Sequence, residues 1–159
     1  MNAVKCLIYF ILLGIITHFL GEALDRGRFD PERFPYRQFW WEKSGSVYKL
    51  LRVKRWKNKL PDAGDYWPDM QPKRIGTAIT AEQLESLVIE TCVSEYVHCV
   101  LCVLSLGACI IWQGRGGAVC CLISIFINLQ FIIIQRYNRP HLLKLSKWLR
   151  VREERNKAA

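Results

Sequence analysis

The residues best suited to acid–base chemistry lie in the stretch SEYVH, where Glu95 precedes His98 by three positions. That spacing places both side chains on one face of a helix. A carboxylate beside an imidazole fixes the tautomer of the ring and makes its other nitrogen a better base. We therefore predict that His98 is a general base oriented by Glu95, with Glu90 more than one turn earlier on the same helix.

A second group of polar residues closes an apolar run that reads NLQFIIIQRYNRP. Its amides, Asn128 and Gln135, are candidate hydrogen-bond donors to an oxyanion. Its guanidinium groups, Arg136 and Arg139, are candidates to hold a phosphate or a developing negative charge. Asn128 has an alternative role as a polar contact between packed helices. Pro140 disfavours helical geometry at the residue before it, so we expect the helix to end there.

Three apolar segments must position these residues. They cover about residues 6–24, 96–113 and 118–135, and each meets or approaches the ~20 residues that a helix needs to cross ~30 Å of hydrocarbon. We predict an all-α integral membrane protein with about three transmembrane helices, built as a single domain over residues 1–159. A signal peptide is the alternative for the first segment, but Lys5 alone is a weak n-region and no Ala-x-Ala site follows.

Positive charge is distributed unevenly around these segments. Thirteen Lys and Arg residues lie between the first and second segments and eight follow the third, against Lys5 and Arg115 at the opposite ends. Since cations near the ends of spans stay on the cytoplasmic side, we predict a multi-pass protein of the cell membrane with the N-terminus outside and the C-terminus cytoplasmic. Polar residues of all three segments then lie within about two turns of the inner boundary. They are His18, Glu95, His98, Asn128 and Gln135, with the part played by His18 left open.

The predicted cytoplasmic interfacial segment, residues 25–95, interleaves aromatic residues with Lys and Arg. This mixture is typical of chain that lies at the level of the lipid headgroups. Two functions are open for it: a solvated basic anchor, or a floor that binds the phosphates of an anionic ligand such as a coenzyme A thioester. We also expect a short helix within residues 46–60, ended by Pro61, and a longer helix that starts at Thr80 and continues into the second span.

The remaining features of the composition argue against metal and nucleic acid. Seven cysteines lie mostly in or beside the apolar segments, where cysteine acts as a small hydrophobe. Cys99 and Cys102 lack the second pair or the nearby histidines that a zinc site needs. The net charge of +9 gathers at predicted membrane boundaries, which favours anionic lipid or an anionic substrate over nucleic acid. We expect no metal and no bound cofactor.

Three stretches of the chain carry a resemblance: RVKRWKNKLPD (52–62), IETCVSEYVH (89–98) and NLQFIIIQRYNRPHL (128–142). They resemble the glycosyl-4,4'-diaponeurosporenoate acyltransferase family, small membrane proteins of the last step of staphyloxanthin synthesis. The resemblance implies carotenoid biosynthesis by O-acylation, in which a fatty acyl group moves onto a sugar hydroxyl of a glycosylated carotenoid acid. The matching positions are Trp56, Lys57, Glu90, Glu95, His98, Asn128, Gln135, Arg136, Tyr137, Asn138, Arg139 and Pro140.

We accordingly predict an acyltransferase with His98, Glu95 and Asn128 as catalytic residues. The predicted substrate-binding residues are Glu90, Gln135, Arg136, Tyr137, Asn138, Arg139, Trp56 and Lys57. The expected donor is an acyl thioester, either acyl-CoA or acyl carrier protein, and the expected acceptor is a glycosylated lipid of the membrane. A homodimer is a further expectation, because three spans enclose only a shallow site. The alternative function is a non-enzymatic membrane scaffold or lipid-binding subunit whose polar residues only join the helices.

Overall fold

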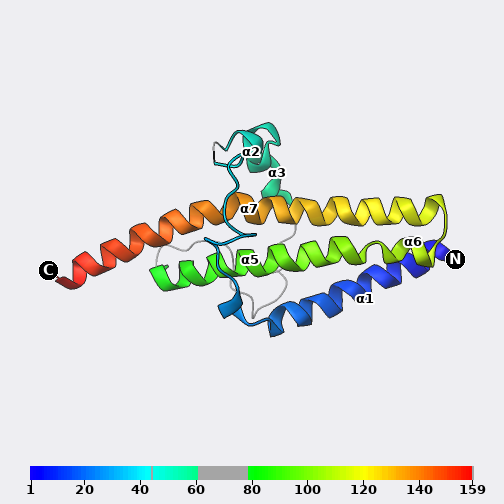
Figure 1. Ribbon diagram of the computed structural model, residues 1–159, viewed down its shortest axis with the longest axis horizontal. Coiled ribbons are helices and arrows are strands. Elements are labelled where there is room, and N and C mark those ends of the chain that lie inside the picture. Colours follow the sequence, from blue (N-terminus) through cyan, green and yellow to red (C-terminus); the bar gives the residue numbers. More distant parts are fainter. Residues whose placement is uncertain (44, 61–78, 159) are drawn as a thin grey trace. The chain divides into compact units, whose positions relative to one another are not determined.

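A computed structural model describes residues 1–43, 45–60 and 79–158. Every regular element in these ranges is a helix, which confirms the predicted all-α fold. Three regions are long and apolar enough to cross a membrane (Figure 1). They are α1 (Asn2–Ala23), α5 (Ala81–Leu104) together with α6 (Gly107–Ile111), and α7 (Arg115–Ala158).

The chain forms two compact units. The first combines Met1–Phe29 with Cys92–Gln135, and the second combines Asp30–Thr91 with Arg136–Ala159. The first unit holds the apolar parts of the helices, and the second holds most of the basic, aromatic-rich segment together with the polar part of α7. The expectation of a single domain stays a prediction.

The first unit turns apolar side chains outward and polar ones inward. Leu7, Ile11 and Phe19 on α1, like Leu122 and Phe126 on α7, are each more than half exposed. The buried positions of α7 include Cys121, Asn128 and Gln135. Water would not favour this distribution, whereas lipid does. The predicted polar stripe of the third span therefore faces protein, and its apolar side faces outward.

The C-terminal end of α1 is capped by the side chain that follows it. Arg26, in the short 3-10 helix η1 (Arg26–Arg28), donates from Nη1 to the carbonyls of Gly21, Glu22 and Leu24, at 3.0, 2.6 and 2.8 Å. The last carbonyls of a helix have no partner within it, and a cation there also complements the helix dipole. One arginine thus meets both needs where the chain leaves the apolar helix.

The second predicted span, residues 96–113, was expected to be one continuous helix, but the structure divides it into two helices. α5 ends at Leu104 and α6 follows after a turn. In an unbroken helix the Leu104 carbonyl would accept from the backbone N–H of Ala108, but that N–H donates to the Ser105 carbonyl at 3.1 Å. The Leu104 carbonyl accepts instead from the hydroxyl of Tyr9 on α1, at 2.6 Å. A side chain of α1 thus replaces the missing helical hydrogen bond.

Pro140 does not end the third helix, contrary to the prediction. α7 continues without interruption to Ala158, with Pro140 inside it. Proline removes the N–H that would bond the Arg136 carbonyl, and it usually kinks or breaks a helix. Here Arg136 and Arg139, in the turn before the proline, each donate several hydrogen bonds to other segments of the second unit. These contacts hold a helical path that the local sequence disfavours.

The expected helix within residues 46–60 is divided into short pieces, α2 (Ser46–Leu50), α3 (Val53–Trp56) and the 3-10 helix η2 (Lys57–Lys59). The break falls at Arg52, whose φ of 50° is left-handed. Pro61, predicted to end this helix, lies outside the described residues.

The start of α5 agrees with the prediction. Thr80 Oγ1 accepts from the Gln83 N–H at 3.2 Å, and Gln83 Oε1 accepts from the Thr80 N–H at 3.0 Å. This reciprocal pair is a capping box, which satisfies two N–H groups at the helix start.

Candidate functional site

The imidazole of His98 is joined to the amide of Asn128 in the first unit. His98 Nδ1 lies 2.8 Å from Asn128 Oδ1, and Asn128 Nδ2 donates to the Ser124 carbonyl at 2.9 Å. Because a backbone carbonyl only accepts, the second bond turns the amide nitrogen toward Ser124 and the amide oxygen toward the ring. Nδ1 therefore carries the proton of neutral His98, and the lone pair is on Nε2, the atom that can act as a base.

Packing also fixes the plane of the His98 ring. The ring stacks on Phe131, with centroids 4.6 Å apart and planes 4° apart. Asn128 and Phe131 are three residues apart on α7, so one face of this helix provides both the hydrogen bond and the stacking surface. A second polar contact, 2.7 Å between the hydroxyls of Ser105 and Ser124, joins α7 to the turn after α5.

Two other predicted residues of the first unit are buried. Glu95 lies about one turn before His98 on α5 and is 5% exposed, and Gln135 on α7 is 2% exposed. Polar groups within apolar helices carry an energetic cost and often mark function. The first unit therefore contains an imidazole held by Asn128 and Phe131, a buried carboxyl group and a buried amide.

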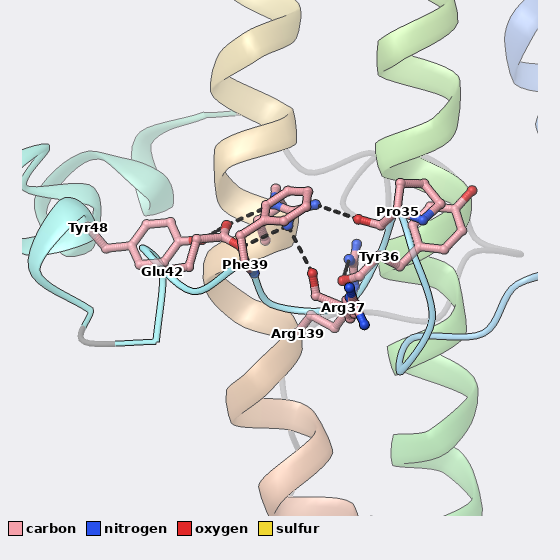
Figure 2. A network of polar contacts seen from close by, with 8 residues as sticks. Pro35, Tyr36, Arg37, Phe39, Glu42, Tyr48 and Arg139 are labelled. Atoms are coloured by element: carbon pink, nitrogen blue, oxygen red, sulfur yellow. Dashed lines mark hydrogen bonds and ion pairs between the residues drawn. The ribbon is translucent and has the colours of Figure 1, made fainter.

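In the second unit, Glu42 and Arg136 form a buried ion pair (Figure 2). Arg136 Nε donates to Glu42 Oε1 at 2.8 Å, and Arg136 Nη2 donates to Oε2 at 2.7 Å. Glu42 also accepts from the Tyr48 hydroxyl at 2.5 Å and from the Phe39 N–H at 2.7 Å. Its side chain is 1% exposed, so protein donors take the place of water around the carboxylate.

These contacts set the charge of the Glu42 carboxyl. Burial acts to raise the pKa of Glu42, but hydrogen bonds from Arg136, Tyr48 and the Phe39 N–H outweigh burial and hold the pKa below its ordinary value. Glu42 is therefore ionised at neutral pH, and the pair with Arg136 stays charged.

The Arg136 guanidinium also fixes the segment that leads to Glu42. It donates to the Pro35 carbonyl and to the Arg37 carbonyl, each at 3.1 Å, and it lies over the Phe39 ring at 4.3 Å. In Figure 2, dashed lines run from the carbonyl groups of the labelled Pro35 and Arg37 to the donors of these hydrogen bonds. Arg136 thus contacts residues 35, 37, 39 and 42 and helps to hold this segment on α7.

Arg139 makes a second junction three residues further along α7. It is 2% exposed, and it donates to the Tyr36 carbonyl at 2.7 Å, to Thr91 Oγ1 at 2.8 Å and to the Thr91 carbonyl at 3.0 Å. Arg139 thereby connects α7 both to the extended segment and to α5.

Lys57 packs against the residues between these two arginines. Its Nζ donates to Asn138 Oδ1 at 3.0 Å and lies 4.8 Å from the centroid of the Tyr137 ring. Burial, and then the charge of Lys54, lower the pKa of Lys57 below its ordinary value. Tyr137 meets Tyr48 edge-on, with ring centroids 5.5 Å apart. Residues of two separate stretches that carried the resemblance are therefore in contact.

Comparison with known proteins assigns the chain to a family. The sequence model of the glycosyl-4,4'-diaponeurosporenoate acyltransferase family matches residues 31–148. The chain belongs to this family. The predicted enzyme class, an acyltransferase, is thereby confirmed, and the match contains the contacts of His98 and of Glu42 described above.

Curated relatives of this name are similar to nearly the whole chain. The glycosyl-4,4'-diaponeurosporenoate acyltransferase of Staphylococcus aureus strain MRSA252 is 30% identical, and that of strain N315 is 29% identical. Each alignment covers 98% of this chain and 94% of the relative. No solved structure matches the chain significantly.

The structure gathers some of the predicted site residues and gives others structural contacts. It joins His98 to Asn128, and Lys57 to Tyr137 and Asn138. Trp56 donates from Nε1 to the Leu51 carbonyl of its own segment at 2.9 Å. The catalytic and binding roles of all these residues, with those of Glu90, Glu95, Gln135, Arg136 and Arg139, stay predictions. Among the described residues, no group of three or more His, Cys, Asp and Glu side chains could hold a metal.

Sequence reasoning missed the partners of the predicted residues. Phe131 carried a signal, because it lies three positions after Asn128 on the predicted polar stripe. Glu42 carried a weaker one, as an acid directly after FWW in a basic segment. Thr91 and Tyr36 carried none, since their roles depend on a carbonyl and a hydroxyl that meet Arg139 only in the folded chain.

Proposed function

We propose that this protein is a membrane O-acyltransferase that moves a fatty acyl group from a thioester onto a sugar hydroxyl of a glycosylated carotenoid acid or a related glycolipid. Family membership supports acyl transfer, and the relatives named for glycosyl-4,4'-diaponeurosporenoate support this class of acceptor. The observation that carries the proposal is the 2.8 Å contact between His98 and Asn128 within apolar helices. The charge distribution supports an N-terminus outside the cell and a cytoplasmic C-terminus.

His98 acts as the general base in this mechanism. Its Nε2 takes the proton of the acceptor hydroxyl while the hydroxyl oxygen forms a bond to the thioester carbonyl carbon. The carbon–sulfur bond then breaks, and the protonated imidazole returns the proton to the departing thiolate. The products are an ester and a free thiol, and no covalent acyl-enzyme is required.

Asn128 positions the base. Both ends of its amide have partners, His98 at the oxygen and the Ser124 carbonyl at the nitrogen, which favours an orienting role. As the ring gains its second proton, the Asn128 oxygen stays hydrogen-bonded to Nδ1. Donation to the oxyanion is assigned to Gln135, a buried amide on the same helix, and Glu95, about one turn before His98 on α5, is assigned a supporting role in orienting the imidazole.

The proposal is tested with membranes that contain the full chain, supplied with glycosyl-4,4'-diaponeurosporenoate and an isotope-labelled acyl thioester. Mass spectrometry of the lipid extract detects the labelled ester. We expect His98→Ala to lower turnover about 10²- to 10⁴-fold, the usual contribution of a general base. Its protein level in the membrane should stay close to that of the wild type.

Ser105→Ala is the matched control. It removes a polar contact to α7 in the same unit, at 2.7 Å from Ser124, so it should lower stability by about 1 kcal/mol and leave turnover near wild type. Full turnover by His98→Ala would contradict the assignment of the base. Failure of the wild type to acylate any glycolipid acceptor would favour the scaffold function.

A further inference from the structure

The second unit contains a pocket of about 770 Å³, within the ~300–1,000 Å³ typical of small-molecule sites. Its walls come from the stretch that begins at Gln38, from α2 and α3, and from α7 around Tyr137. Tyr48 and Tyr137 provide aromatic surface against which a planar ring can pack. The base chemistry proposed for His98 involves none of the residues that line this pocket.

Cations dominate the lining of this pocket. They are Lys43, Lys49, Arg52, Lys54, Arg55 and Lys144. None of the six forms an ion pair within the described ranges 1–43, 45–60 and 79–158. The acid in the lining, Glu42, is already neutralised by Arg136. Among the residues that the structure describes, this concentrated positive charge has no counter-ion, and such charge raises the local concentration of anions.

The backbone at Arg52 adds an independent observation. Its φ of 50° lies in the left-handed region, where a residue with a Cβ is strained and glycine is not. Such strain persists only where the surrounding structure demands it. An arginine holds this position between α2 and α3, on the wall of the pocket.

We propose that this pocket binds the phosphate groups of a coenzyme A thioester, and thus that the acyl donor is a coenzyme A derivative. This inference rests on the proposed function. Coenzyme A bears a diphosphate and a 3'-phosphate monoester, the latter carrying about −1.5 to −2 charges at neutral pH. Six cations spread over three segments suit several phosphates at once, whereas one phospholipid headgroup presents a single diester. A carrier protein would need a wider surface than a pocket of this volume.

The first test varies the phosphates of the donor while the acyl chain is kept constant. The full chain in lipid nanodiscs is assayed with acyl-CoA, acyl-3'-dephospho-CoA and acyl-pantetheine. We expect KM to rise each time phosphate is removed from the donor, by about tenfold or more for the 3'-phosphate. Of the three donors, only acyl-CoA should show a KM that rises strongly with salt concentration. Equal KM values for the three donors, or efficient use of acyl carrier protein alone, would overturn the inference.

The second test uses Arg52→Gly, a variant that separates binding from folding. Glycine relieves the left-handed strain, so stability should be equal to or above that of the wild type. The KM for acyl-CoA should rise about tenfold, and the KM for acyl-pantetheine should not change. A structural role for Arg52 predicts the opposite pattern, with altered stability and no change in donor affinity.

Two lysines three residues apart on α7 form a matched control. Lys144 lines the pocket, whereas Lys147 bonds to Glu32 and does not. Lys144→Gln should raise the KM for acyl-CoA several-fold, and Lys147→Gln should leave it unchanged although both variants lose one charge. Equal effects of the two variants would show that only net charge matters, and would contradict a specific site.

Direct binding distinguishes this inference from the proposed function. Titration of the nanodisc protein with coenzyme A should show saturable binding that weakens in Arg52→Gly. If no ester forms but this binding is present, acyl transfer fails and the coenzyme A pocket stands. If ester forms but coenzyme A does not bind, the pocket inference fails alone. If coenzyme A binds to the protein in neutral lipid nanodiscs but not in anionic lipid nanodiscs, the pocket binds lipid headgroups, and the proposal is overturned.

Discussion

The buried pair of Glu42 and Arg136 allows a quantitative test of how the second unit is held together. We consider Glu42→Gln, Arg136→Met and the double variant. Glu42→Gln leaves a guanidinium with an 11% exposed side chain without its counter-ion, and Arg136→Met leaves a 1% exposed carboxylate with only Tyr48 and the Phe39 N–H as donors. Each single change therefore removes the opposite charge from a buried charged group, which keeps only its neutral hydrogen-bond partners.

The expected cost follows from that burial. Removing one partner of a buried ion pair typically costs about 3–5 kcal/mol, because the remaining charge has lost both water and its partner. The double variant strands neither charge, so it should cost less than the sum of the two single changes. We expect a coupling free energy of about 2–3 kcal/mol between the two positions. The coupling free energy thus measures how much the charge pair itself, beyond the packing of the two side chains, stabilises the second unit.

The free energy of unfolding is measured in detergent or nanodiscs by pulse proteolysis, with cleavage in the segment around residues 30–43 as the reporter. The pair Lys147 and Glu32 serves as a control, because their side chains are 68% and 63% exposed. A double-mutant cycle on this exposed pair should give a coupling below about 1 kcal/mol.

A coupling below about 0.5 kcal/mol for Glu42 and Arg136 would refute the reasoning, since it would mean that the pair behaves like an exposed one. Single variants that leave cleavage of residues 30–43 unchanged would also refute it, because the pair would then not hold this segment on α7.

Two further predictions follow from the same structure. Because the pKa of Glu42 is lowered in the folded protein, the ionised carboxylate stabilises the fold fully above the ordinary glutamate pKa of 4.5, and this stabilisation is lost as pH falls through the folded-state pKa. Glu42→Gln should therefore make the free energy of unfolding less dependent on pH in this acid range. An unchanged pH profile in this variant would contradict the prediction. A Cβ at Gly117 would collide with the backbone carbonyl of Trp112, so Gly117→Ala should lower the free energy of unfolding by about 1–3 kcal/mol. Gly114 has open space at the position of a Cβ but a φ of 89°, so Gly114→Ala should cost about 1–2 kcal/mol from backbone strain alone. Thermal unfolding measures both effects on the junction of α6 and α7.

The sequence was sufficient to predict the apolar helices and their polar stripe. Length and the absence of charge placed three spans, and the spacing of Cys121, Asn128 and Gln135 placed one face of α7 against protein. These features depend on local composition and helical period, which a single chain displays directly. The contact of His98 with Asn128 was within reach, because both residues were predicted to lie at one depth.

The remaining errors come from contacts between distant parts of the chain. Pro140 has a strong local tendency to end a helix, and the hydrogen bonds of Arg136 and Arg139 to distant segments oppose that tendency. At the break after Leu104, the hydroxyl of Tyr9, ninety-five residues away, donates to the Leu104 carbonyl. No window of sequence around either position contains this information, because the partner that decides the outcome lies outside the window.

The motif Arg136-Tyr137-Asn138-Arg139 has a geometric explanation that does not depend on catalysis. Consecutive residues of a helix point about 100° apart, so these four cover most of the circumference of α7. Arg136 and Arg139 hold residues 35–42, while Tyr137 and Asn138 meet Tyr48 and Lys57. A segment that contacts all four must follow the surface of α7 around its axis. Loss of activity in Arg136 or Arg139 variants therefore does not identify an anion ligand, unless the affinity for coenzyme A falls while residues 35–42 stay protected from proteolysis.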